Sequence, residues 1–153
     1  MKHRVLFVCT GNICRSPVAE GPFQAALDGD GEHTGWQVDS AGTHAGKGIC
    51  PAPAAVAVAA AYGADISALR SRPLEKADFV RFDTIVALDC GHLDMISFMR
   101  PEAFSGTITL MPSTARSGFI EVPDPYGGSR RGYETAGRLI VDDIAALLTE
   151  LRS

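Results

Sequence analysis

The sequence lacks the features of a membrane-spanning or exported protein. Its 153 residues contain no apolar run near the length of about 20 residues that spans a bilayer. The apolar stretch after the basic N-terminus is short and is broken at once by polar residues, unlike a signal peptide. We therefore expect a cytoplasmic protein without a membrane partner.

An excess of basic charge is also missing. Fourteen Lys and Arg residues face 18 Asp and Glu residues, for a net charge of −4, and this balance argues against nucleic acid as a partner. Cysteine is scarce, with no CxxC pair and no Cys/His set at zinc spacing. In a reducing compartment the four cysteines are expected to be thiols. We expect no metal and no cofactor.

Strand and helix patterns alternate along the chain. A continuous apolar run at residues 4–8 is typical of a central parallel strand. The final helix begins near Tyr133 and carries one apolar stripe. Further strands are predicted at 36–41, 83–88 and 107–110, and further helices at 17–28, 52–62 and 91–99. The alternation predicts one α/β domain, residues 1–153, with helices on both faces of an open parallel sheet. Pro22 predicts a kink or restart in the first helix.

The segment Cys9-Thr10-Gly11-Asn12-Ile13-Cys14-Arg15-Ser16 links the first strand to the first helix. Ligands of open α/β sheets bind at this edge. Gly11 and Asn12 tolerate left-handed backbone angles, so the loop can aim successive N–H groups at one anion. The helix N-terminus and the planar guanidinium of Arg15 add positive charge. The loop is therefore predicted to bind a phosphate-sized anion.

A cysteine at the end of a strand can be a packing residue, a metal ligand, half of a disulfide or a nucleophile. Cations and helix N-termini stabilise a thiolate, and Ser16 can donate a hydrogen bond to the sulfur of Cys9. The residues thus favour phosphoryl transfer through a phosphocysteine. The leaving group then needs a proton, for which Asp124 in EVPDPYGG is the best candidate, beside Tyr126 as a pocket wall.

These motifs resemble the low-molecular-weight protein tyrosine phosphatases of bacterial type over nearly the whole chain. VLFVCTGNICRSPVAE is similar to the CX5R(S/T) loop of that family, and DPYGG is similar to its acid loop. VDSAGT, GADIS and ADFVRFDTIVALD match in order and spacing. The resemblance implies a four-stranded parallel sheet in a three-layer αβα, flavodoxin-like fold, and a metal-independent phosphatase for phosphotyrosine on proteins.

The resemblance also implies roles for the catalytic residues. Cys9 would be the nucleophile, Arg15 would hold the phosphoryl oxygens, and Asp124 would act as acid and then as base. Substrate binding would fall to the loop and its neighbour, namely Thr10, Gly11, Asn12, Ile13, Cys14, Ser16 and Tyr126. Bacterial members point to a tyrosine autokinase of exopolysaccharide export as partner, or to a secreted role in a host. We expect a monomer.

Supporting roles follow in the same way. Asn12 and Ser40 would belong to a hydrogen-bonded network behind the loop, with Ser16 assisting the thiolate. Cys14 would form a reversible disulfide that protects Cys9 from further oxidation. The family's histidine of this network is replaced by Leu69, which predicts that one support is missing or replaced.

The entrance of the pocket departs from the family pattern. Gly128 stands where a second tyrosine often follows DPY, and residues 44–48 lack the aromatic that many members place at the rim. We therefore expect a more open entrance.

Three alternative functions stay open. An arsenate reductase on this fold uses a further cysteine pair, of which only Cys90 has a counterpart here. A phosphoarginine phosphatase tends to carry threonine where this loop has the bulkier Ile13. A silent phosphate-binding module would lack a catalytic residue, yet all three are in the sequence.

Overall fold

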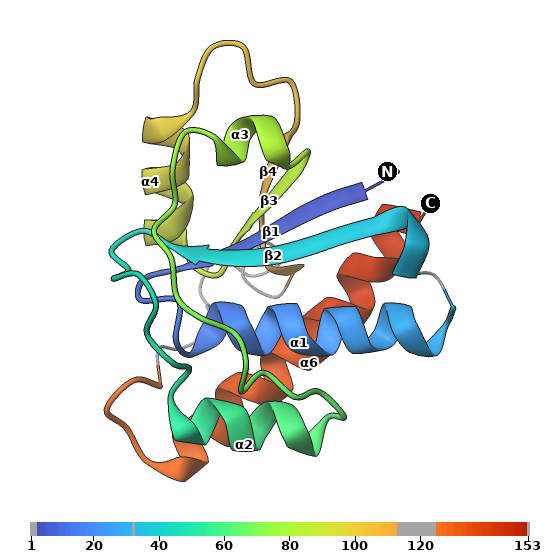
Figure 1. Ribbon diagram of the computed structural model, residues 1–153, viewed down its shortest axis with the longest axis vertical. Coiled ribbons are helices and arrows are strands. Elements are labelled where there is room, and N and C mark those ends of the chain that lie inside the picture. Colours follow the sequence, from blue (N-terminus) through green and yellow to red (C-terminus); the bar gives the residue numbers. More distant parts are fainter. Residues whose placement is uncertain (1–2, 32, 113–124, 153) are drawn as a thin grey trace.

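The computed structural model describes residues 3–31, 33–112 and 125–152. Strands and helices alternate through most of this length (Figure 1). The elements are β1 (His3–Cys9), α1 (Arg15–Gly29), the short 3-10 helix η1 (His33–Gly35), β2 (Trp36–Gly42), α2 (Pro53–Ala61), α3 (Asp78–Arg81), β3 (Thr84–Ala87), α4 (Cys90–Met99), β4 (Thr107–Leu110) and α6 (Arg130–Arg152).

The four strands form one parallel sheet in the order β2-β1-β3-β4. In the register of this sheet, Val5 of β1 lies opposite Val38 of β2 and Thr84 of β3. Residues 5–8 are fully buried, which explains why this strand reads as a continuous apolar run. The predicted four-stranded parallel sheet is confirmed.

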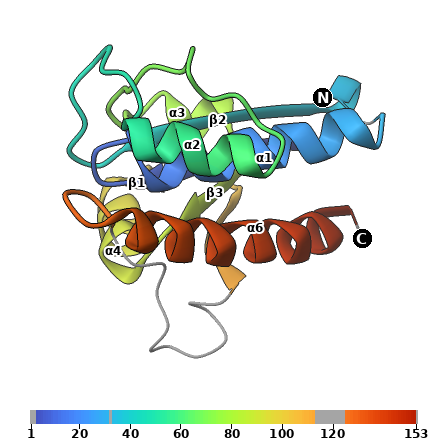
Figure 2. The ribbon, with the colours of Figure 1, turned by 90° about the horizontal axis from the view of Figure 1, so that it is seen from below.

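Helices cover both faces of the sheet, which confirms the three-layer architecture. Helices α1, α2 and α6 lie on one face and α3 and α4 on the other (Figures 1 and 2). Each face has its own apolar core because side chains alternate along a strand: Val5 and Phe7 belong to the first core, Leu6 and Val8 to the second. Because both faces of the sheet are packed, its carboxyl edge is held in place, and the loops that follow the strands begin there.

The strand and helix predictions hold within a few residues, with two differences. Of the kink or restart expected at Pro22, the restart is wrong, because α1 runs as one helix from Arg15 to Gly29 through this proline. Pro22 is buried together with Val18 and Phe23, and this packing outweighs the single backbone hydrogen bond that proline removes. The short elements α3 and η1 were not predicted.

Helix α6 packs against α1 and α2 through its buried stripe, which includes Ile140, Ile144, Leu147 and Leu148. Among the helices in the described ranges, none combines the length and the apolar character that crossing a bilayer requires.

Candidate active site

The loop between β1 and α1 lies at the carboxyl edge of the sheet, where ligand sites of this architecture form. β1 is flanked by β2 and β3, so its last residue, Cys9, is surrounded by loops from both neighbours. Cys9 is 2% exposed and opens onto a cavity of about 260 Å³. Its walls are formed by Cys9, Thr10, Gly11, Ile13, Cys14, Arg15, His44, Gly46, Ile49 and Tyr126.

The path of the loop depends on two backbone features. Asn12 has φ of 58°, the one positive φ of a non-glycine residue in the described ranges, in agreement with the predicted left-handed turn. Gly42, at the end of β2, approaches the loop so closely that a Cβ there would collide with the carbonyl oxygen of Thr10. The backbone N–H of Asn12 is thereby turned towards Cys9.

Two hydrogen-bond donors surround the Cys9 sulfur. The Asn12 N–H donates to Sγ over 3.3 Å, and the Ser16 hydroxyl lies 2.9 Å from the same atom. Donors at these positions stabilise a thiolate relative to a thiol. The structure therefore gives Cys9 the surroundings of a nucleophile.

The side chain of Asn12 holds the loop from behind. Its Nδ2 donates to Ser16 Oγ at 2.8 Å and to Ser40 Oγ at 2.9 Å, and its Oδ1 accepts the backbone N–H of Arg72 at 3.0 Å. Because Ser16 Oγ accepts from Asn12, its own proton has two acceptors within reach, the sulfur of Cys9 at 2.9 Å and the more distant Ala41 carbonyl oxygen at 3.5 Å. The hydrogen bonds predicted among Asn12, Ser16 and Ser40 are thus present in the structure.

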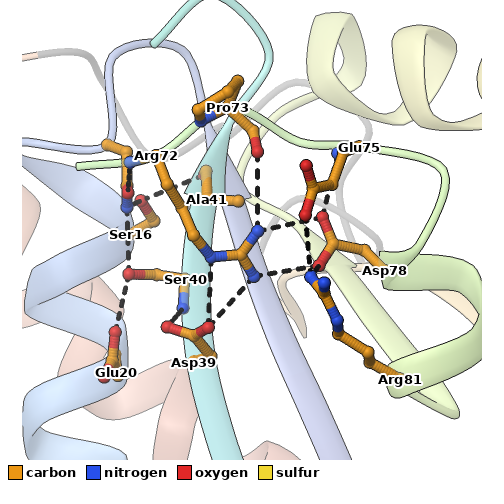
Figure 3. Close-up of polar contacts among 11 residues, drawn as sticks. Ser16, Glu20, Asp39, Ser40, Ala41, Arg72, Pro73, Glu75, Asp78 and Arg81 are labelled. Atoms are coloured by element: carbon orange, nitrogen blue, oxygen red, sulfur yellow. Dashed lines mark hydrogen bonds and ion pairs between the residues drawn. The ribbon is translucent and has the colours of Figure 1, made fainter. Parts of the chain in front are cut away.

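Glu20 extends this network and was missed from the sequence. The Ser40 hydroxyl donates to Glu20 Oε1 over 2.6 Å (Figure 3). Burial raises the pKa of Glu20 from 4.5 to about 7; the Ser40 hydrogen bond and the charge of Arg72 oppose this rise, and the charge of Asp39 adds to it. A polar face on an otherwise apolar helix was the signal in the sequence. Leu69, at the family's histidine position, packs against the apolar core instead of joining the network.

Arg72 fixes the segment that supports Asn12. Its guanidinium lies between two carboxylates, with Nη2 3.0 Å from both Asp39 Oδ2 and Asp78 Oδ1 (Figure 3). Burial alone would lower the pKa of Arg72, but the hydrogen bonds and charges of Asp78 and Asp39 raise it above its ordinary value. The backbone of Arg72 also accepts the N–H of Gly42, which ties this segment to β2.

Arg15, 3% exposed, is held by a carboxylate that the sequence analysis also missed. Its Nη1 donates to Asp89 Oδ2 over 2.8 Å. Burial would raise the pKa of Asp89, but hydrogen bonds from the His92 backbone and Arg15, together with their charges, hold it below its ordinary value. Asp89 therefore stays ionised and orients the guanidinium. Its place just after β3, beside the end of β1, was the signal that could have identified it.

The entrance of the cavity contrasts with its base. Tyr126 is 69% exposed and Ile49 is 49% exposed, and both line the cavity together with Ile13. Ile49 lies over Gly46, since a Cβ at Gly46 would be 2.9 Å from Ile49 Cδ1. Residues 44–48 contain no aromatic side chain. The aliphatic side chain of Ile49 lies at the rim of the cavity instead.

Cys14 and Asp124 are the two other residues predicted for the site. Cys14 shares the cavity with Cys9, and its Sγ lies 3.4 Å from the Tyr133 hydroxyl; both cysteines are free thiols. Asp124, the predicted acid, lies outside the described residues.

Two larger hollows, of about 470 and 640 Å³, lie along α6. Neither is lined by a cysteine. Cys9 and Arg15 line the smaller cavity.

Comparison with known proteins gives a consistent result. Residues 4–153 match the family model "Low molecular weight phosphotyrosine protein phosphatase". The low molecular weight protein-tyrosine-phosphatase of Streptomyces coelicolor is 39% identical over 99% of this chain and 95% of its own length. A protein-arginine-phosphatase of Geobacillus stearothermophilus is 35% identical over 99% of this chain and 95% of its own.

Solved structures agree. Vibrio vulnificus Wzb in complex with benzylphosphonate is 28% identical and superposes with a TM-score of 0.84, covering 98% of this chain and 99% of its own. The family match spans most of the cavity lining, including the buried cysteine and the arginine beside it. The chain thus belongs to the low molecular weight phosphotyrosine protein phosphatase family.

Proposed function

We propose that this chain hydrolyses phosphotyrosine on proteins through a phosphocysteine intermediate without a metal. The observation that carries the proposal is the base of the cavity. The Cys9 sulfur receives donors from Asn12 N–H and Ser16, and the Arg15 guanidinium, oriented by Asp89, lies on the same cavity wall. A dianionic phosphoryl group is the substrate that this combination of nucleophile and cation favours.

The reaction has two steps. The Cys9 thiolate attacks phosphorus as the bond to the tyrosine oxygen breaks, and Asp124 gives its proton to the leaving phenolate. Water then attacks the phosphocysteine, Asp124 takes a proton from that water, and phosphate leaves with the thiolate restored. Arg15 holds the oxygens of the phosphoryl group in both steps. The role of Asp124 rests on the DPY motif of the sequence.

The walls of the cavity support an aryl ester. Ile13, Ile49 and Tyr126 offer apolar surface around an entrance that leads to the phosphate loop. A phenyl ring gains from contact with such groups. The benzylphosphonate that occupies the related Wzb structure has the same combination of ring and phosphorus-centred anion.

Phosphoarginine is the second candidate, because a relative of 35% identity is a protein-arginine-phosphatase. A charged guanidinium leaving group would meet the apolar side chain of Ile13 at the cavity wall. This contact favours phosphotyrosine.

The tyrosine autokinase partner, the monomeric state and the cytoplasmic location stay predictions.

The test is hydrolysis of 4-nitrophenyl phosphate in EDTA by the unmutated chain, Cys9→Ser and Asp124→Ala. We expect turnover by the unmutated chain, none by Cys9→Ser and a deep loss of kcat in Asp124→Ala. Phosphotyrosine and phosphoarginine peptides then separate the two candidates. A reduced, folded protein without turnover on any of these esters would overturn the proposal.

A further inference from the structure

His92 occupies a position in α4 that fixes its ring. Asp89 is the N-cap of this helix, and its Oδ1 accepts the His92 backbone N–H at 3.0 Å. In return, the Asp89 backbone N–H donates to His92 Nδ1 at 3.2 Å. This reciprocal pair is a capping box, in which two helix N–H groups are satisfied at once.

The capping box also selects the tautomer of the ring. In the neutral imidazole that accepts the Asp89 N–H at Nδ1, the proton resides on Nε2; in the protonated ring, whose Nδ1 lies 3.2 Å from Asp89 Oδ1, Nε2 carries a proton as well. The ring is only 4% exposed. His92 therefore presents one N–H donor in a fixed direction.

That donor reaches the phosphate loop. His92 Nε2 lies 2.8 Å from Thr10 Oγ1, and Thr10 lines the cavity directly after the nucleophile Cys9. A hydroxyl has a single proton, and Oγ1 already accepts from His92. The Thr10 proton is consequently directed away from the ring and is available to an acceptor in the cavity.

The same helix terminus also holds the arginine of the loop. Asp89 Oδ2 accepts from Arg15 Nη1, whereas Arg15 Nη2, 3.4 Å from His92 Nε2, makes only a packing contact with the ring because both nitrogens carry protons. Two residues of one helix turn thus contact both ends of the loop, Thr10 near its start and Arg15 at its end. A packing histidine would satisfy the cap without making the contact to Thr10.

We propose that His92 is a positioning residue that orients the Thr10 hydroxyl as a donor to the phosphoryl group bound in front of Cys9. The inference rests on the proposed function, because the phosphoryl group is the acceptor that it requires. Its effect is on the binding of the anion, through Thr10, and not on the fold of α4.

Two substitutions separate positioning from capping. In His92→Asn, the amide oxygen takes the place of Nδ1 and keeps the cap, but no atom reaches Thr10. In His92→Gln, the longer side chain brings an amide nitrogen near the place of Nε2. We expect His92→Asn to raise the dissociation constant of inorganic phosphate about three- to tenfold, the effect of one hydrogen bond, and His92→Gln to recover most of it. Thermal unfolding should change little in either variant.

Thr10 supplies the matched test on the loop. Thr10→Val removes the hydroxyl at nearly constant shape, and Thr10→Ser keeps it. We expect Thr10→Val to weaken phosphate binding as much as His92→Asn does, and the double variant to lose no more than either alone. Thr10→Ser should bind like the unmutated chain. If His92→Asn fails to fold, the two Thr10 variants still decide whether the hydroxyl contacts the anion.

Calorimetric titration with inorganic phosphate, alongside kcat and KM for 4-nitrophenyl phosphate, is the measurement. Additive losses in the double variant, or unchanged phosphate affinity in Thr10→Val, would overturn the role of His92 while the unmutated enzyme still turned over. An unmutated chain that neither binds phosphate nor hydrolyses the ester would instead overturn the proposed function.

Discussion

The base and the entrance of the cavity are built in opposite ways. At the base, Asn12, Ser16 and Ser40 are each 5% exposed or less and are joined by hydrogen bonds. At the entrance, Ile49 and Tyr126 are 49% and 69% exposed. Buried polar groups tolerate little change because each lost partner leaves an unsatisfied atom, whereas exposed apolar groups can vary at small cost. Under the proposed function, we expect the base to determine the chemistry and the entrance to determine the choice of substrate.

The largest expected effect is on the charge at the base. Arg15→Lys keeps one positive charge but loses the planar fork that can pair with Asp89 and with phosphoryl oxygens together. We expect kcat/KM for 4-nitrophenyl phosphate to fall by about 10²- to 10³-fold. Arg4→Lys is the control, since Arg4 pairs with Asp83 at the surface, and it should retain activity. If Arg15→Lys kept most of the activity, the planar guanidinium would not be required at the base of the cavity.

Asn12→Ala tests the network behind the loop. It removes the partner of Ser16, Ser40 and the Arg72 N–H, and it places alanine at a φ of 58°. We expect the free energy of unfolding, measured in urea, to fall by about 3 kcal/mol. Asn12→Gly, which relieves the backbone angle, should recover only part of this. A loss below about 1 kcal/mol would show that the network contributes little to stability.

Glu20→Gln tests the carboxyl group at the far end of the network. Between 4.5 and about 7, the ordinary and raised pKa values of Glu20, the folded protein holds a proton that the unfolded chain has released. The free energy of unfolding contributed by this group therefore falls as pH rises through that window. Above about pH 7, Glu20 is ionised in both the folded and the unfolded protein. Burial of the charged carboxylate then lowers the free energy of unfolding by about 3 kcal/mol.

Glutamine keeps an acceptor for Ser40 and cannot ionise. The difference in unfolding free energy between Glu20→Gln and the unmutated chain should be near zero at pH 4.5 and grow in favour of the variant up to pH 8. Asp39 and Arg72 face the same carboxyl group, so urea titrations of both proteins at each pH cancel their shared contribution. A constant difference across this range would contradict the raised pKa.

The sequence predicts the sheet because its signals are local. The apolar run of residues 4–8 and the stripe of α6 each follow from the burial of one element. The loop is equally local, since Cys9, Asn12, Arg15 and Ser16 are neighbours in the chain. The restart expected at Pro22 failed because tertiary packing outweighed a local preference.

The missed residues have in common that their partners are distant in sequence. Asp89 reaches Arg15 across 74 positions, His92 reaches Thr10 across 82, and the Arg72 amide reaches Asn12 across 60. No spacing pattern connects them, because the contact exists only once β3 lies beside β1. Glu20 is near the loop, but its role depends on Ser40 in β2. The position of Asp89 after a strand marks it as a candidate, but its partner is defined only once the sheet has brought the carboxyl ends of its strands together.

The smallest effect is expected at the entrance, from Ile49→Ala. Ile49 lines the cavity and lies over Gly46, where it offers apolar contact to a substrate ring. Its loss should raise KM for 4-nitrophenyl phosphate roughly threefold with kcat unchanged. A threefold change corresponds to the loss of about 0.7 kcal/mol of apolar contact with the substrate. Ile49→Phe should lower KM, and Val80→Ala, an exposed apolar change on α3, should alter neither constant. Because Ile49 is expected to contact the ring and not the phosphoryl group, the inhibition constant of inorganic phosphate should not respond. A fall in kcat would place Ile49 with the base of the cavity and remove the contrast between the two regions.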